Sequence, residues 1–317
     1  MEITPLNEYS PSPVTPPLKS TNKKFRLLIG LSFGALLLVV LAAVSTAVYF
    51  LPANDMLVRS VTAVVPYPVA LVNLQPISFK DFYKEYDALE TFYEANQTPE
   101  EEQLPATERA SNVLDSMIDH IVVSQLAKQY SVELDPVKVE ENLQAAFTQS
   151  GSEEAFYTEI ERVFNWTRQD FLTHALEPLV LADQVEEKVL SDATLQTETT
   201  DKINQALTRI KNNEDFATVA GEVSEDTTAA SGGDLGHLTV AEMPEEWTNF
   251  VTTAELNVIS EVIDVGQVYT LVMVTEKVES EEETQYNIKA IVVYKRGLAE
   301  VMDSFLESSK IWKLMQV

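Results

Sequence analysis

The sequence contains no cysteine, only three histidines, and less than half as many basic as acidic residues. Without cysteine there is no disulfide, no thiolate metal site, no cysteine nucleophile and no lipidated N-terminal cysteine. Lys plus Arg number 22 against 50 Asp plus Glu, a net charge of −28. Residues 1–26 carry +2, so the rest of the chain carries −30. That part lacks the clustered basic residues that bind phosphates, which argues against nucleic acid as a ligand.

The remaining composition is that of a folded chain. At 317 residues the chain is long enough for about two domains, and 45% hydrophobic residues suffice for their cores. No two of the three histidines have the spacing of metal ligands, so the sequence predicts no metal site and no cofactor. Acidic runs such as 100–102 and 281–283 are interpreted as solvated surfaces.

One long apolar run, residues 27–51, contains no charge. At about 1.5 Å per residue a helix of this length reaches roughly 37 Å, enough for a hydrocarbon core of about 30 Å. Basic residues precede the run and Asp55 follows it, so the positive-inside rule predicts a cytoplasmic tail at 1–26 and an extracytoplasmic part at 52–317. The alternative is a signal peptide cleaved near the small residues 45–47, but the length of the run favours a retained anchor in the cell membrane.

The tail is rich in proline and is predicted to be disordered, and residues 52–72 form an extended lead-in. A helical domain is predicted over 73–190, because apolar residues recur at helical spacing and capping residues precede each segment. The predicted helix starts are Ser78, Asp135 with Pro136, Ser152, and Thr167 with Asp170.

Several stretches of this region carry a shared pattern. They are Ala70-Leu71-Val72-Asn73, Ile77-Ser78, Asp81-Phe82, the helix 114–127, residues 132–139, and residues 156–171 with Asn165-Trp166-Thr167. Through them the region resembles the N-terminal chaperone domain of the SurA/PrsA-type periplasmic foldases. The resemblance implies a domain that binds unfolded exported polypeptides.

The composition turns threonine-rich and polar at 191–200, which indicates a hinge before a second domain at 191–317. That domain reads DFATVAGEVSED, then SGGDLG, MPEEW and VISEVIDVGQVYTLVMVTEK. In this order and spacing it resembles the parvulin-type (PpiC) peptidyl-prolyl isomerases. The resemblance implies helices packed on a small twisted antiparallel sheet, with a shallow apolar pocket for a proline ring.

The resemblance also implies site residues. Asp226 stands where the family has a Cys or Asp that faces the target amide, and is the candidate catalytic residue. The candidate substrate-binding residues are Leu235, Met243, Trp247, Thr270 and His237. The alternatives are that Leu235 and Trp247 are simply core residues and that His237 is an exposed loop residue.

Two departures from the family concern its paired histidines. Thr270 replaces the second histidine, and no family-like first strand stands before Ile203. A strand at 286–294 followed by an amphipathic helix offers a substitute, so residues 281–317 are predicted to replace the missing first strand and helix by circular permutation. Ala290 would then stand at the first histidine position.

The sequence thus predicts an α+β protein with a single transmembrane helix, a helical chaperone-like domain and a parvulin-like domain. Two functions remain open. One is a membrane-anchored prolyl cis-trans isomerase acting on proline-containing exported chains. The other is a non-catalytic holdase chaperone with an inactivated parvulin module.

Overall fold

The computed structural model describes residues 39–40, 42–51, 55–280 and 283–315. They divide into two compact units, one ending at Thr62 and the other running from Ala63 to Met315. In the first unit residues 42–50 are helical and α2 spans Met56–Thr62. The predicted tail and most of the predicted membrane helix, residues 27–38 and 41, lie outside the described residues. Within the described ranges no helix is both long and apolar enough to cross a membrane.

The second unit begins with a hairpin made by β1 (Pro68–Val72) and β2 (Gln75–Ser78). Asn73 and Leu74 form its two-residue turn with φ values of 51° and 72°, the left-handed conformation that such tight turns require. Ser78 then begins α3 (Phe79–Ala95), because its hydroxyl accepts a hydrogen bond from the backbone N–H of Asp81 at 3.1 Å. The predicted N-cap at Ser78 is confirmed.

Further helices follow where the sequence predicts them. They are α4 (Ala106–Gln129), α5 (Pro136–Ser150), α6 (Glu153–Phe164), α7 (Arg168–Phe171) and α8 (Glu177–Ser191), with a 3₁₀ turn at Glu100–Glu102 and a π-helical turn, η2, at Leu172–Leu176. The side chains of Asp135, Ser152 and Thr167 each cap the helix that follows, so these predicted starts are also confirmed. The apolar face of α4 is buried along most of its length and forms the core of this helical region.

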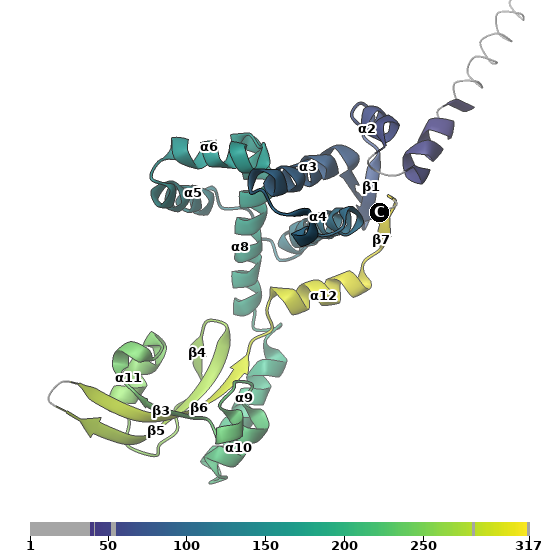
Figure 1. The fold of residues 1–317 in the computed structure, drawn as a ribbon. Helices are drawn as coiled ribbons and strands as arrows, with labels where there is room; N and C mark the ends of the chain where they lie inside the picture. Colours follow the sequence, from purple (N-terminus) through teal and green to yellow (C-terminus); the bar gives the residue numbers. More distant parts are fainter. Residues whose placement is uncertain (1–38, 41, 52–54, 281–282, 316–317) are drawn as a thin grey trace, which may run out of the picture. The chain divides into compact units, whose positions relative to one another are not determined.

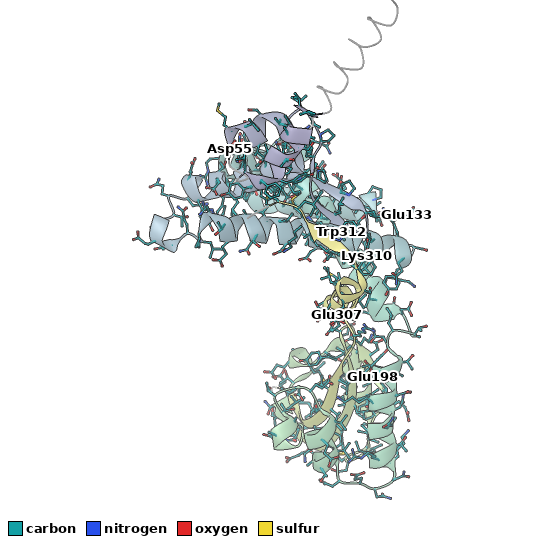
Figure 2. The ribbon with its side chains drawn as sticks, turned by 90° about the vertical axis from the view of Figure 1, so that its right-hand side faces the viewer. Asp55, Glu133, Glu198, Glu307, Lys310 and Trp312 are labelled. Atoms are coloured by element: carbon teal, nitrogen blue, oxygen red, sulfur yellow. The ribbon has the colours of Figure 1, made fainter. Side chains whose placement is uncertain are left out.

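The C-terminal segment packs on the helical region (Figures 1 and 2). Helix α12 (Leu298–Ser308) contacts α4 and α8, and β7 (Ile311–Lys313) pairs antiparallel with β1. Asn73 holds this return in place, since its side-chain carbonyl accepts a hydrogen bond from the Lys310 N–H at 2.9 Å. Helix α12 is predicted to replace the first parvulin helix, whereas in the structure it packs on α4 and α8.

The sheet domain contains four strands in the order β3-β6-β5-β4, each antiparallel to its neighbours (Figure 1). The strands are β3 (Asp234–Leu238), β4 (Ile263–Val265), β5 (Val268–Glu279) and β6 (Thr284–Tyr294). Although β6 comes last in sequence, it occupies the interior of the sheet. Helices α9 (Thr197–Lys211) and α10 (Phe216–Val223) pack on one face, and α11 (Glu245–Thr253) packs on the other.

The GGDLG turn owes its glycines to a close approach to β6. Gly233 has φ of 75°, and a Cβ on it would lie 2.2 Å from the carbonyl oxygen of Ala290. The Gly233 carbonyl in turn accepts a hydrogen bond from the Ala290 N–H at 2.8 Å. Only glycine fits a backbone held this close to the interior strand.

The chain crosses between the helical region and the sheet domain twice, and Gln196 joins the two crossings. Its amide is 1% exposed, donates to the carbonyls of Val189 and Arg296, and accepts from the Arg296 N–H at 2.9 Å. Glu186 accepts a hydrogen bond from the first N–H of α12, at Leu298. The predicted hinge at 191–200 therefore contains a buried, fully hydrogen-bonded residue.

Candidate functional site

The candidate site lies on the sheet face covered by α11. Met243 and Trp247 pack there against Val272, Ala290 and other buried residues of β5 and β6. Only 7% of Met243 and 5% of Trp247 is exposed, so both side chains belong to the core of this face. The more accessible apolar side chains around them are Leu235, Leu238, Phe250, Ile263, Val265 and Val292.

Trp247 and Thr270 are joined by a hydrogen bond. The indole N–H of Trp247 donates to the Thr270 hydroxyl at 2.9 Å, and Thr270 is 1% exposed. The hydroxyl also has the Ile263 carbonyl oxygen within 3.4 Å as an acceptor. A buried indole N–H needs an acceptor, and a threonine on the neighbouring strand supplies one. Thr270, which stands at a histidine position of the family, therefore contacts the predicted pocket residue Trp247 directly.

Asp226 is held by the loop that follows α10. Its carboxylate accepts hydrogen bonds from the Ser224 hydroxyl at 2.6 Å and from the hydroxyl and N–H of Thr228 at 2.6 and 3.2 Å. Burial alone would raise the pKa of Asp226, but these hydrogen bonds outweigh it and hold the pKa below its ordinary value. Asp226 is therefore an ionised acceptor at neutral pH and cannot donate a proton there.

Ser224 connects Asp226 to the interior strand. Its hydroxyl accepts a hydrogen bond from the Val292 N–H at 2.9 Å, and the Val292 carbonyl accepts from the Glu225 N–H at 2.8 Å. On the other side of β6, Val292 lies directly opposite Thr270, while Ala290 lies opposite Val272. The order across the sheet is thus Ser224, Val292, Thr270. The two positions where the resemblance places the family histidines, Thr270 on β5 and Ala290 on β6, thus hold a hydroxyl and a methyl side chain.

The two predicted residues on β3 differ in exposure. Leu235 is half-buried and packs with the residues under α11, as a wall residue would. His237 is exposed, and its Nε2 lies 3.4 Å from a carboxylate oxygen of Glu276 on β5. The structure thus brings four of the predicted residues together on one face of the sheet: Leu235, Met243, Trp247 and Thr270. Asp226 is anchored through Ser224 to β6, a strand of the same sheet.

This arrangement offers apolar surface and hydrogen-bond acceptors but no activated nucleophile. Asp226 has no histidine or lysine partner in its hydrogen-bond set, which consists of hydroxyls and backbone N–H groups. Across the described ranges, no group of three His, Asp or Glu residues could hold a metal ion. Such a face suits a reaction that rotates a bond without cleaving one, or the binding of an apolar chain segment.

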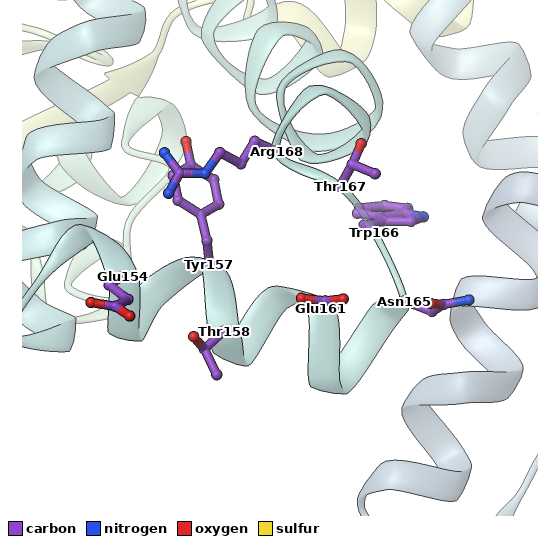
Figure 3. Close-up of a pocket in the computed structure, with 8 residues that line it drawn as sticks. All are labelled: Glu154, Tyr157, Thr158, Glu161, Asn165, Trp166, Thr167 and Arg168. Carbon is purple, nitrogen blue, oxygen red and sulfur yellow. The ribbon is translucent and has the colours of Figure 1, made fainter.

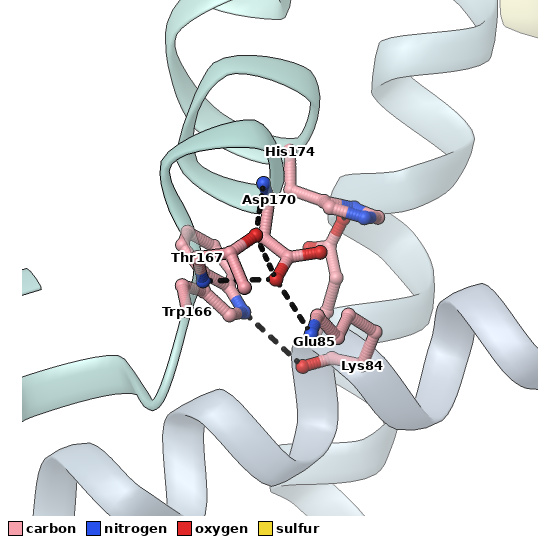
Figure 4. Close-up of polar contacts among 6 residues, drawn as sticks. All are labelled: Lys84, Glu85, Trp166, Thr167, Asp170 and His174. Atoms are coloured by element: carbon pink, nitrogen blue, oxygen red, sulfur yellow. Dashed lines mark hydrogen bonds and ion pairs between the residues drawn. The ribbon is translucent and has the colours of Figure 1, made fainter. Parts of the chain in front are cut away.

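A polar cluster in the helical region was not predicted as a site (Figure 4). Lys84 of α3 forms an ion pair with Asp170 at 2.7 Å, and Glu85 lies 3.1 Å from Nδ1 of His174. The hydrogen bond with Glu85 raises the pKa of His174 above its ordinary value, against the effect of burial. Hydrogen bonds from Lys84 and Thr167 lower the pKa of Asp170 to about 2, although burial opposes them. No local sequence signal pairs His174 with a glutamate 89 residues away.

Two cavities flank this cluster. One of about 510 Å³ is lined by Lys80, Asp81, Tyr83, Lys84, Asp87, Asp170 and His174. The other, of about 360 Å³, lies between α6 and the start of α7, where Arg168 covers the ring of Tyr157 at 4.3 Å (Figure 3). Trp166 lines the second cavity, where it stacks on Phe164 and lies tilted against His174. Its indole N–H also donates to the Lys84 carbonyl at 3.4 Å, so Trp166 helps to pack the start of α7 against α3.

Comparison with known proteins agrees with the two-part organisation. Residues 31–171 match the SurA-like N-terminal domain, and residues 179–278 match the PPIC-type PPIASE domain. The foldase protein PrsA of Halalkalibacterium halodurans is 25% identical over 228 residues, which is 63% of this chain and 68% of that protein. A solved structure of the peptidylprolyl isomerase PrsA from Bacillus anthracis aligns with 16% identity and a TM-score of 0.21, covering 61% of this chain and 86% of that one.

The predicted resemblance to both families is thereby confirmed at the level of domains, and the α+β class is confirmed by the helical region and the antiparallel sheet. Residues 31–171 are thus similar to the SurA-like N-terminal domain and residues 179–278 to the PPIC-type rotamase domain, and the chain as a whole is distantly similar to the foldase protein PrsA.

Proposed function

We propose that this protein is a membrane-anchored, extracytoplasmic foldase that binds unfolded exported polypeptides and accelerates the isomerisation of their X-Pro bonds. The observation that carries the proposal is the apolar sheet face under α11, with Asp226 anchored beside it, in a chain that also has a SurA-like domain. The barrier to be lowered is about 18–20 kcal/mol, and it is crossed by rotation alone.

Each site residue has a proposed role. Leu235, Met243 and Trp247 would form the apolar wall for a proline ring, and Thr270 supports this wall through its hydrogen bond to the indole. Asp226 would face the twisted amide as a fixed negative charge, and His237 would edge the pocket. Removing the target amide from water favours its less polar, twisted form, so the wall and the carboxylate require no covalent step.

Membrane anchoring is proposed from the sequence. The uncharged run 27–51 and the basic residues before it support a retained helix with the N-terminus in the cytoplasm and residues 52–317 outside. The strongly acidic composition of the part after residue 26 would oppose adhesion to anionic lipid and self-association.

A circular permutation of the parvulin sheet is proposed from the position of β6. In the sequence β6 comes after β3, β4 and β5. In the sheet it lies between β3 and β5. The strand that comes first in the sequence of a parvulin domain would here be supplied by the C-terminal part of the domain. Only the first strand of the parvulin domain would be replaced in this way, by β6. The first helix would not be, because α12 packs on α4 and α8.

A non-catalytic holdase is the second candidate, and the burial of the wall favours it. Met243, Trp247 and Thr270 are 7%, 5% and 1% exposed, so a proline ring reaches them only when α11 moves outward. Both histidine positions are also occupied by other residues. In this version the helical region binds clients and the sheet domain serves only as scaffold.

The two candidates separate in paired assays on the full chain in nanodiscs. One assay follows prolyl isomerisation of a peptide without a protease, and the other follows suppression of aggregation of a denatured protein. The isomerase proposal expects a rate enhancement that Met243→Ala and Asp226→Asn reduce and that Asn249→Ala, an exposed residue of α11, leaves unchanged. Suppression of aggregation without any rate enhancement would instead establish the holdase.

A further inference from the structure

Helix α2 exposes the two large apolar residues at its start and buries the opposite side. Met56 is 85% exposed and Leu57 47% exposed, whereas Val58 and Thr62 are 0% and 2% exposed. At 100° per residue, Met56, Leu57 and Ser60 share one side of the helix, and Val58 and Thr62, four residues apart, share the other. The described protein therefore covers the side with Val58 and Thr62 and leaves most of Met56 and about half of Leu57 uncovered.

The composition of this segment differs from the rest of the acidic chain. From Met56 to Val65 the only charged residue is Arg59, although the sequence after residue 26 carries a net charge of −30. Apolar exposure continues at Val64 and Val65, which are 84% and 44% exposed. An apolar stretch kept uncharged in so acidic a chain indicates an apolar surrounding.

The position of α2 in the chain identifies that surrounding. The apolar run ends at residue 51, and α2 begins after only four more residues, 52–55. Four residues span at most about 14 Å, so α2 must lie near the point where the run ends. The last helical turns of the run, which include the buried Val48 and the 70% exposed Phe50, belong to the same compact unit as α2.

We infer that the exposed side of α2, Met56 and Leu57 with Ser60, lies in the lipid interface at the outer end of the membrane helix. This rests on the proposed anchoring by residues 27–51. Short helices with one apolar side bind membranes in the plane of the headgroups, with the apolar side chains reaching the acyl boundary. The function of such a helix is to hold the first residues of the second unit close to the bilayer surface.

The absence of cysteine makes the inference directly testable. Single-cysteine chains carrying Met56→Cys, Leu57→Cys or Asn249→Cys are labelled with an environment-sensitive fluorophore and reconstituted into phosphatidylcholine–phosphatidylglycerol vesicles. Asn249 is exposed on α11 and reports the aqueous control position. Quenching by nitroxide-labelled lipid and by aqueous iodide is measured, and alkaline extraction is run separately on each sample.

The inference expects the labels at residues 56 and 57 to emit at shorter wavelength than the label at 249, to be quenched by nitroxide lipid and to be protected from iodide. Labels at 56 and 57 that iodide quenches as strongly as at 249, in protein that resists alkaline extraction, would overturn the inference and leave the anchoring intact. Protection that appears only when a denatured client protein or a second copy at high density is added would assign the surface to that partner and also overturn it. Protein released by alkali would refute the anchoring itself.

Discussion

The hydrogen bond between Trp247 and Thr270 should contribute a measurable coupling energy to the sheet domain. Replacing Thr270 by valine keeps the β-branched shape but removes the acceptor of the buried indole N–H. An unsatisfied buried donor costs about 1–3 kcal/mol, and no cavity is created to add to it. Trp247→Phe removes the donor together with part of the ring and should cost about 1–3 kcal/mol, mostly from lost packing.

The double variant distinguishes the hydrogen bond from packing. Once Trp247 is phenylalanine, Thr270→Val loses only the long 3.4 Å contact with the Ile263 carbonyl. Its cost should fall to about 0.5 kcal/mol, so the sum of the two single effects exceeds the double effect by about 0.5–2.5 kcal/mol. Thr252→Val is the matched control, because that hydroxyl lies exposed on α11 and bonds only to the Thr248 carbonyl within its own helix.

Urea-dependent hydrogen exchange read by mass spectrometry is the appropriate assay. It reports the free energy of unfolding for β5 and β6 separately from the helical region, which unfolds as a different part of the same chain. It also avoids tryptophan fluorescence, which the substitution itself would change. If the effects of Thr270→Val and Trp247→Phe add to within about 0.3 kcal/mol, the hydrogen bond has no energetic role and the reasoning fails.

Three further outcomes follow from the structure. Gly233→Ala should lower the Tm of the sheet domain far more than Gly236→Ala, because both have φ of 75° but only at Gly233 would a Cβ strike backbone, and equal shifts in calorimetry would contradict this. The pKa of His174 is raised in the folded state, so its contribution to stability is full below the unfolded pKa of 6.5 and is lost as pH rises through the folded pKa. Glu85→Gln should therefore shift the NMR titration of His174 to lower pH. An unchanged titration would refute the pairing of His174 with Glu85. Ending the chain at Ser280 should abolish cooperative melting of the sheet domain, because it removes β6 and leaves β3 without its partner strand. A truncated chain that still melts cooperatively would show that β6 is dispensable.

The features that the sequence predicted best depend on neighbours in the chain. Ser78, Asp135, Ser152 and Thr167 each cap a helix through a bond to a residue two or three positions ahead, so a short window of sequence contains both partners. The GGDLG turn is similar, because positive φ is a local property of glycine.

The features that could not be predicted depend on distant partners. The apolar spacing of α12 shows that one side is buried, but the same pattern would fit against the sheet or against α4 and α8. The ion pair of Lys84 with Asp170 and the contact of Glu85 with His174 join α3 to a segment more than eighty residues later. Periodicity shows that an element has a buried side, and it does not show which element covers that side.

The candidate site illustrates the same limit in its chemistry. The resemblance marks Thr270 as a departure that weakens the case for an active pocket, and it places Trp247 among the pocket residues. The structure joins the two, since the indole N–H of Trp247 finds its acceptor in the Thr270 hydroxyl. Threonine does not titrate between pH 5 and 8, so the support under the wall keeps one protonation state across that range. The hydrogen bonds of Asp226 keep it ionised at neutral pH. Any isomerisation at this face must therefore come from the apolar wall and a fixed negative charge.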